Sequence, residues 1–302
     1  MNEDFPSSSP SNPAAHVTIV TDSVAQIPSE IAHQLNIRVM PLTVTVKDTT
    51  YIDGIDLNPG NLYQRMRREK DLPVKTSAPS VGEFYSAFKQ CYENGAKNIL
   101  YVGLTGKLSG AINAATVAAK MLSEETNIPQ IKIFDTRLAT IAEGFLAMEA
   151  ARLANQGINL DQLLKHLEEE RQRVGFAAGL ETLEYLARSG RISKALYLFG
   201  NATKILPVVS LNNDGKVVLV SRAIGYHQVL KEIVHYVKHE VTGFHQLSLA
   251  VMHADAFHWA ETLKEMAVEQ IHPDDIMITD FTPVMVAHSG PGMIGMAYHW
   301  RP

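Results

Sequence analysis

The sequence predicts an α/β protein of two domains, and three observations support this fold class. Apolar strand-like runs alternate with helical patterns through the first half of the chain, which is typical of a parallel or mixed sheet with helices on both faces. A hairpin signal at 212–215 joins two apolar runs in the second half. The length, 302 residues, exceeds that of one ordinary domain. We expect a flexible leader over 1–15, an N-terminal α/β/α sheet domain over 16–173 and a C-terminal α+β domain with a mixed or antiparallel sheet over 174–302.

The first half is expected to alternate strands with helices. The helix signals are proline at a first helical position (Pro28), capping-box spacing between Ser80 and Glu83, and a stop at Gly95. The helix expected over 140–154 has apolar residues on most of its sides, which predicts that it is buried. The expected strands are 16–23, 39–46, 98–104 and 131–134, and the other expected helices are 28–35, 59–69, 81–94 and one after Gly110, with a turn at 51–56 and a hydroxyl-rich loop at 73–80.

The second half begins with a helix that Asn159 and Gln162 cap and that ends in a charge run over 168–173, interpreted as a solvated face. The apolar runs and turn residues beyond it predict a hairpin followed by further alternation. The expected strands are 174–180, 204–211, 216–222, 247–253, 276–279 and 284–288, and the expected helices are 181–188, 226–240 and 257–270.

Composition narrows the classes of function. With 46% apolar and 20% charged residues and a net charge of −5, the chain has an ordinary globular composition and lacks a basic run that would bind nucleic acid. Its apolar runs all fall short of the ~18 residues of a membrane helix, so we expect no stable membrane insertion. The single cysteine, Cys91, excludes an internal disulfide and fits a reducing compartment. The leader lacks the features of a signal peptide, which favours the cytoplasm.

The stretch over 100–110 is the first candidate site. A buried strand leads into a loop with glycines and hydroxyls, and a helix follows, so unsatisfied amide N–H groups and the helix dipole favour an anion. Leu108 stands where a phosphate loop needs a hydroxyl, and Gly103, Gly106 and Gly110 do not have dinucleotide-binding spacing. A non-catalytic anion cradle remains, with carboxylate as a good ligand. The glycines fit a simple tight turn equally well.

Two further features bear on chemistry. His288 precedes a glycine-rich turn over 289–292, where backbone amides are expected to be open. A catalytic triad of Ser109, His288 and Asp135 is the alternative that would make the chain an enzyme. Asp53 and Asp56 are interpreted as turn residues, and the histidines lack metal-ligand spacing, so we predict no metal.

The motifs taken together resemble the DegV family of bacterial fatty-acid-binding proteins, from about residue 17 to residue 298. The ordered set is specific, although each motif alone is not. It consists of Thr21-Asp22-Ser23, Met40-Pro41-Leu42 with Tyr51 and Asp53 downstream, Thr76-Ser77-Ala78-Pro79-Ser80, Leu108-Ser109-Gly110, Leu186-Ala187-Arg188-Ser189-Gly190-Arg191-Ile192-Ser193, Pro207-Val208-Val209 with Asp214-Gly215, and His288-Ser289-Gly290-Pro291-Gly292.

The resemblance implies a carrier without catalytic residues. A long-chain fatty acid would lie in a buried tunnel between the domains, its carboxylate held by Thr76, Ser109 and His288, with Arg191 at the pocket mouth or at a partner contact. Four further positions are expected to lie around these three carboxylate donors. They are Ser77, Thr105, Gly110 and Ser289. The partner would be a separate fatty acid kinase that forms an acyl phosphate for phospholipid synthesis, and no cofactor is implied beyond the bound fatty acid.

Some positions leave alternatives open. The family pattern has a serine where this chain has Gly106, and lysine before proline where it has Leu206. The apolar residues in and near the last predicted strand fit either a lining for the acyl tail or plain core. They are Met285, Val286, Met293, Ile294 and Met296. The alternative function is a serine-dependent enzyme acting on a small carboxylate or acyl substrate, with Ser109 as nucleophile and His288 as base.

Overall fold

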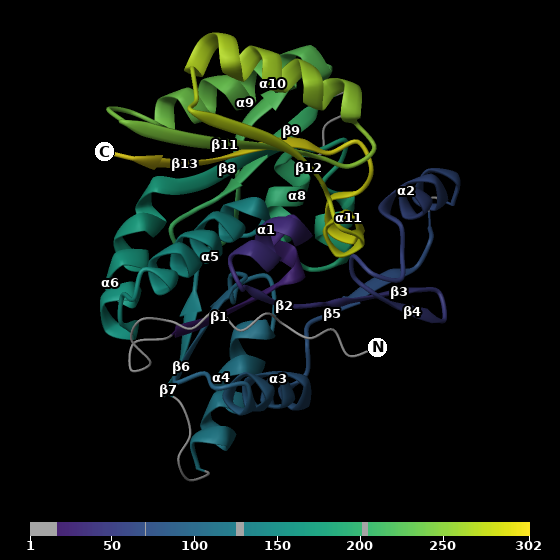
Figure 1. Ribbon diagram of the computed structural model, residues 1–302. Coiled ribbons are helices and arrows are strands. Elements are labelled where there is room, and N and C mark those ends of the chain that lie inside the picture. The colour runs from purple at the N-terminus through teal and green to yellow at the C-terminus, as the bar shows by residue number, and fades with distance from the viewer. Residues whose placement is uncertain (1–16, 70, 125–129, 201–204) are drawn as a thin grey trace.

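The computed structural model describes residues 17–69, 71–124, 130–200 and 205–302. The expected leader over 1–15 and Lys204 lie outside these residues. The fold is α/β, with a parallel N-terminal sheet and a mixed C-terminal sheet, as predicted. Helices and sheets alternate in layers in Figure 1. Helices α9 (Tyr226–Glu240) and α10 (Phe257–Ile271) lie above the second sheet, α5 (Thr140–Asn155) lies between the sheets, and α3 (Val81–Glu93) and α4 (Ala111–Ser123) lie below the first.

The first sheet has four parallel strands in the order β2-β1-β6-β7. Its strands are β1 (Val17–Asp22), β2 (Arg38–Met40), β6 (Asn98–Gly103) and β7 (Gln130–Asp135). One face packs on α3 (Val81–Glu93) and α4 (Ala111–Ser123). The predicted capping box of Ser80 and Glu83 is formed at the start of α3. The short helix α1 (Ser29–Gln34) follows β1, with Pro28 at its start.

Within the described residues, the second sheet has six strands in the order β10-β9-β8-β13-β11-β12, of which β11 and β12 alone pair in parallel. The strands are β8 (Val174–Gly179), β9 (Leu206–Leu211), β10 (Val217–Ala223), β11 (Gln246–His253), β12 (Asp275–Asp280) and β13 (Ile294–Arg301). Helices α9 (Tyr226–Glu240) and α10 (Phe257–Ile271) cover its outer face. The prediction missed β13, which lies near the centre of the sheet.

A third, antiparallel sheet of order β4-β3-β5 was not predicted. It comprises β3 (Thr43–Val46), β4 (Thr49–Ile52) and β5 (Val74–Ser77), and α2 (Pro59–Arg68) connects the last two strands. The single strand expected over 39–46 is therefore two strands in different sheets. Pro41 lies at the break, where the absence of an N–H suits a chain that leaves one ladder for another. The loop expected over 73–80 contains β5, which pairs with β3.

The prediction of a strand over 284–288 is wrong, because these residues belong to the helix α11 (Pro283–Ser289). A short apolar run has no distinguishing period, and Pro283 at the first helical position is the signal that favours a helix. The helix expected over 181–188 is shorter, as α7 (Glu184–Arg188), and α8 (Lys194–Gly200) was not predicted.

Helix α5 (Thr140–Asn155) packs against strands of both large sheets, and nearly all of its side chains are buried. The prediction of a buried helix is confirmed. Its neighbour α6 (Leu160–Glu170) leads through η2 (Arg171–Arg173) into β8. The 3-10 helix η1 (Ser23–Ala25), which follows β1, also contacts α5. The proposed domain boundary at 173/174 stays a prediction, and Val174 begins the first strand of the second sheet.

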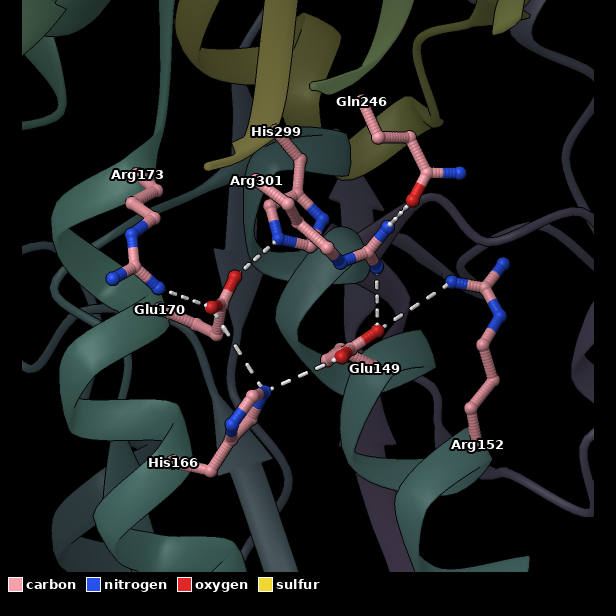
Figure 2. Close-up of polar contacts among 8 residues, drawn as sticks. All are labelled: Glu149, Arg152, His166, Glu170, Arg173, Gln246, His299 and Arg301. Atoms are coloured by element: carbon pink, nitrogen blue, oxygen red, sulfur yellow. Dashed lines mark hydrogen bonds and ion pairs between the residues drawn. The ribbon is translucent and has the colours of Figure 1, made fainter. Parts of the chain in front are cut away.

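The interpretation of 168–173 as a solvated face is wrong in part, because Glu170 and Arg171 are buried. Figure 2 shows why Glu170 tolerates burial: it accepts hydrogen bonds from His299 on β13, at 2.7 Å, and from Arg173. Glu149 on α5 accepts one from Arg301, also on β13, at 2.6 Å. The hydrogen bonds of this polar cluster connect α5 and α6 to the end of β13.

Candidate functional site

Thr76 and His288 form the centre of the candidate site. Thr76 lies on β5 and His288 near the end of α11, and Thr76 Oγ1 is 2.8 Å from His288 Nε2. The pair is 212 residues apart in sequence and is brought together by the packing of α11 against the third sheet. His288 Nδ1 is buried and has no partner among the described residues. A buried ring nitrogen without a partner points to an atom that the protein itself does not supply.

The electrostatics of His288 favour a neutral imidazole. Burial lowers the pKa of His288 to about 4, and the positive charge of Arg191 contributes to the same shift. At neutral pH the ring therefore carries one N–H donor and one acceptor nitrogen. Its contact with Thr76 involves only one of these two nitrogens.

Ser109 lies in the loop that follows β6, directly before Gly110, which is the N-cap of α4. Its Oγ is half-buried and accepts a hydrogen bond from Ala111 N at 3.2 Å, so its hydroxyl hydrogen is not used in that contact. The loop is held by Thr105, whose N–H donates to Leu138 O and whose carbonyl accepts from Ser109 N. The predicted strand, glycine loop and helix start are thus present.

Arg191 joins the two parts of the site. Its Nε donates to Leu108 O at 3.2 Å, beside Ser109, while its charge acts on the imidazole of His288. Burial lowers the pKa of Arg191 itself, but a guanidinium stays protonated at neutral pH. Arg191 is therefore the positive group associated with an otherwise neutral set of donors.

The four surrounding positions differ in their placement. Ser77 is exposed on β5, where alternation turns it away from the face of Thr76. Thr105 is buried and donates to Gly215 O at 3.3 Å, which links the loop to the β9–β10 hairpin. Gly110 is exposed at the N-cap of α4, and a Cβ there would meet open space. Ser289 is buried and donates to Gly290 O.

The turn after α11 is tightly packed rather than open. The amide of Gly290 donates to Val286 O and that of Gly292 to Ala254 O, so neither is available to a ligand. Both glycines have positive φ, and a Cβ would lie 2.3 Å from the Tyr185 ring at Gly290 and 2.0 Å from Glu181 Oε1 at Gly292. The expectation of open amides at 289–292 is therefore wrong.

The two departures from the family pattern have local explanations. Gly106 donates its N–H to Asp135 Oδ2 at 3.2 Å, and a Cβ would approach that oxygen to 3.1 Å. A serine here would crowd the carboxylate. Leu206 begins β9 and packs against the outer core of the second sheet.

The apolar residues near the C-terminus do not line one space. Strand alternation places Ile294 and Met296 in the outer core beneath α9 and α10, whereas Val286 and Met293 belong to the core between the large sheets, against which Met285 packs. Partly buried apolar side chains that were not predicted to line the site pack against the core between the large sheets. They are Leu108, Tyr185, Leu186, Ile192 and Tyr197. Partial burial is the only feature that distinguishes these side chains from other apolar residues, and only the tertiary structure shows it.

The alternative triad is not assembled. Asp135 accepts hydrogen bonds from the amides of Gly106 and Arg137, and His288 contacts Thr76 rather than Ser109. Within the described residues, there is no group of three or more His, Cys, Asp or Glu side chains arranged to hold a metal ion. Among the helices in those same ranges, none is both long enough and apolar enough to cross a bilayer.

A parallel sheet and a mixed sheet pack against one buried helix, and a small third sheet brings Thr76 to a neutral imidazole on α11. These features define an α/β protein with a candidate anion site. The chain belongs to the DegV family. A family model described as "Uncharacterised protein, DegV family" matches residues 16–300.

Individual proteins of this family agree with that assignment. A DegV domain-containing protein of Staphylococcus aureus is 30% identical over 282 residues, covering 92% of this chain and 96% of that protein. A fatty-acid-binding DegV family protein from Thermus thermophilus has a structure similar to this one, with a TM-score of 0.86 and 26% identity over 95% of this chain and 100% of that chain. The fold also matches DegV, a fatty acid binding protein from Bacillus subtilis, with a TM-score of 0.84 and 24% identity over 95% and 100% of the two chains.

Proposed function

We propose that this chain is a carrier that binds a long-chain fatty acid in a buried tunnel between the two large sheets, with the carboxylate held by Thr76, Ser109 and His288. Family membership and the fatty acid binding of the Thermus thermophilus relative support the ligand class. A water-exposed acyl chain forgoes ~0.8 kcal/mol of favourable burial per methylene, so a carrier must enclose it.

The observation that carries the proposal is the Thr76–His288 pair. If the Thr76 hydroxyl donates to Nε2, the imidazole hydrogen remains on Nδ1; if Nε2–H donates instead, the Thr76 hydroxyl hydrogen remains. Either tautomer therefore leaves one hydrogen-bond donor unused. Ser109 also keeps its hydroxyl hydrogen, because its oxygen accepts the N–H of Ala111. Neutral donors with free hydrogens and one nearby arginine suit a carboxylate acceptor.

The chain itself does no chemistry in this proposal. It works in the cytoplasm and presents the carboxylate to a separate fatty acid kinase, whose acyl phosphate product feeds phospholipid synthesis. Arg191 lies at the mouth of the site or at the contact with that partner. The alternative of a serine-dependent enzyme has no supporting geometry, because Ser109 accepts from Ala111 N and His288 is paired with Thr76.

The first test is native mass spectrometry of the purified chain with lipid extraction, followed by titration of the delipidated protein with oleate. We expect a bound long-chain acid, and Ser109→Ala and His288→Ala each to weaken binding by roughly 1–3 kcal/mol. Ser123→Ala, which alters a hydroxyl at the other end of α4, is the matched control and should leave the affinity unchanged. A chain that neither carries nor takes up an acyl ligand contradicts the carrier function. Labelling of Ser109 by a serine-directed covalent probe would instead favour the enzyme.

A further inference from the structure

Asp53 accepts a hydrogen bond from α11 although it lies in a distant part of the chain. Its carboxylate is buried, and Oδ1 accepts the N–H of Val284, in the first turn of α11, at 2.9 Å. Oδ2 accepts the hydroxyl of Ser23 at 2.7 Å, and that hydroxyl in turn accepts the N–H of Leu42 at 3.1 Å. Asp53 is therefore more than the turn residue that its sequence position suggests.

Helix α11 depends on this external support. It has seven residues, and Thr282 at its N-cap makes no capping hydrogen bond with its side chain. So short a helix is not stable by itself, and an anionic group at its N-terminus satisfies an orphan N–H and complements the helix dipole. Tyr63 on α2 adds a second bond to the same region, from its hydroxyl to Phe281 O at 2.9 Å.

The third sheet, of order β4-β3-β5, provides the contacts at both ends of α11. Asp53 directly follows β4 and bonds to the first turn of the helix, while Thr76 on β5 bonds to His288 in the last turn. Strands β4 and β5 both pair with β3, so the distance between the two attachment points is set by one antiparallel sheet. Figure 1 shows α11 beside this sheet and α2.

We propose that Asp53, supported by Ser23, is a positioning residue that holds α11 in the register at which His288 meets Thr76 and the carboxylate of the ligand. This inference rests on the proposed function. Asp53 makes no contact with the ligand: it acts through His288 alone. Substitution of Asp53 therefore weakens fatty acid binding only as long as the imidazole is present.

The test is a double-mutant cycle on oleate affinity with Asp53→Asn and His288→Ala. Asp53→Asn keeps the shape of the side chain and removes its charge. We expect it to weaken binding about tenfold in the native background and to leave the affinity of His288→Ala unchanged within about twofold. The imidazole ¹⁵N resonances of His288 should shift in Asp53→Asn. Equal losses in both backgrounds, or no loss in either, overturn the positioning role.

A milder variant keeps the test decisive if Asp53→Asn fails to fold. Ser23→Ala removes the bond to Oδ2 and the acceptor of the Leu42 N–H, but it leaves the bond from Val284 N–H to Asp53 in place. Ser210→Ala likewise removes a hydroxyl that donates to Phe176 O and accepts from Tyr236, on the second sheet. Ser23→Ala should weaken binding and shift the His288 resonances, and Ser210→Ala should do neither. If His288→Ala itself leaves the affinity intact, the proposed function has failed; if His288→Ala weakens binding but Asp53→Asn and Ser23→Ala do not, only the positioning role has failed.

Discussion

Burial decides the protonation state of His288. The residue sits at the C-terminal end of a helix, a position that favours an imidazolium, yet burial and the charge of Arg191 lower its pKa to about 4. Desolvation therefore outweighs the helix dipole. The neutral ring shares one hydrogen with Thr76 through Nε2, and its Nδ1 has no partner among the described residues.

This protonation state leads to a prediction about pH. In the ligand-free protein we expect the ¹⁵N resonances of His288 to show a neutral imidazole from pH 8 down to about pH 5.5. Because the folded pKa lies below the unfolded value of 6.5, unfolding takes up a proton between these values, so His288 lowers stability as the pH falls from 6.5 through about 4. A titration with a midpoint near 6.5 in the folded protein would contradict this expectation.

At the scale of elements, α5 shows how one helix can serve two sheets. It is apolar on most sides, but it carries Glu143, which is fully buried next to the end of β1 and accepts a weak hydrogen bond from Thr21 at 3.4 Å. Burial raises the pKa of Glu143 well above its ordinary value, and the nearby charge of Asp22 raises it further. Burial likewise raises the pKa of Asp22, which accepts hydrogen bonds from Tyr101 and two backbone amides.

We predict that Glu143→Gln, which imitates the protonated acid, changes the pH dependence of stability. Above pH 4.5 the unfolded chain loses the Glu143 proton while the folded protein keeps it, so wild-type stability falls as the pH rises. The Gln variant lacks this titration. We expect the free energy of unfolding of the variant, measured with urea, to rise relative to that of wild type between pH 5 and pH 8. The rise should be at most about 1.4 kcal/mol per pH unit. A constant difference between the two proteins would mean that Glu143 is ionised in the folded state.

At the scale of the molecule, the cluster in Figure 2 joins the elements before β8 to the last strand of the chain. His299 and Glu170 are both buried, and Arg301 reaches Glu149 on α5. Burial acts to raise the pKa of Glu170, but hydrogen bonds and charges from His299 and Arg173 outweigh it and hold the pKa below its ordinary value. The ionised carboxylate thus contributes to holding α6 against β13.

Glu170→Gln should therefore lower the free energy of unfolding at pH 7 by about 1–3 kcal/mol, because the charge-assisted bonds to His299 and Arg173 are weakened. A carboxylate with a lowered folded pKa stabilises above its unfolded value of 4.5 and loses that contribution as the pH falls below it. The difference from wild type should accordingly be constant from pH 7 to pH 5 and shrink at pH 4. Glu169→Gln, on the exposed side of the same helix, is the matched control and should cost nothing measurable.

Local signals predicted many of the elements because those signals lie within the elements themselves. The capping box of Ser80 and Glu83, the hairpin at 212–215 and the apolar spacing of α5 were sufficient. The break between β2 and β3 and the helical state of α11 were missed, because a short apolar run takes its conformation from whatever packs against it. Strand β13 was missed because it follows a glycine-rich turn and is buried on both faces.

The sequence by itself determined the fold class, the family and the identity of the candidate donors, since these depend on periodicity and on motifs that occupy a few consecutive residues. Only the tertiary structure decided which of those donors meet. Thr76 and His288 are 212 residues apart, Asp53 and Val284 are 231 apart, and each pair is joined by the packing of α11 against the third sheet. Protonation states are decided there too, because the pKa of a side chain depends on how much water the rest of the chain removes from it.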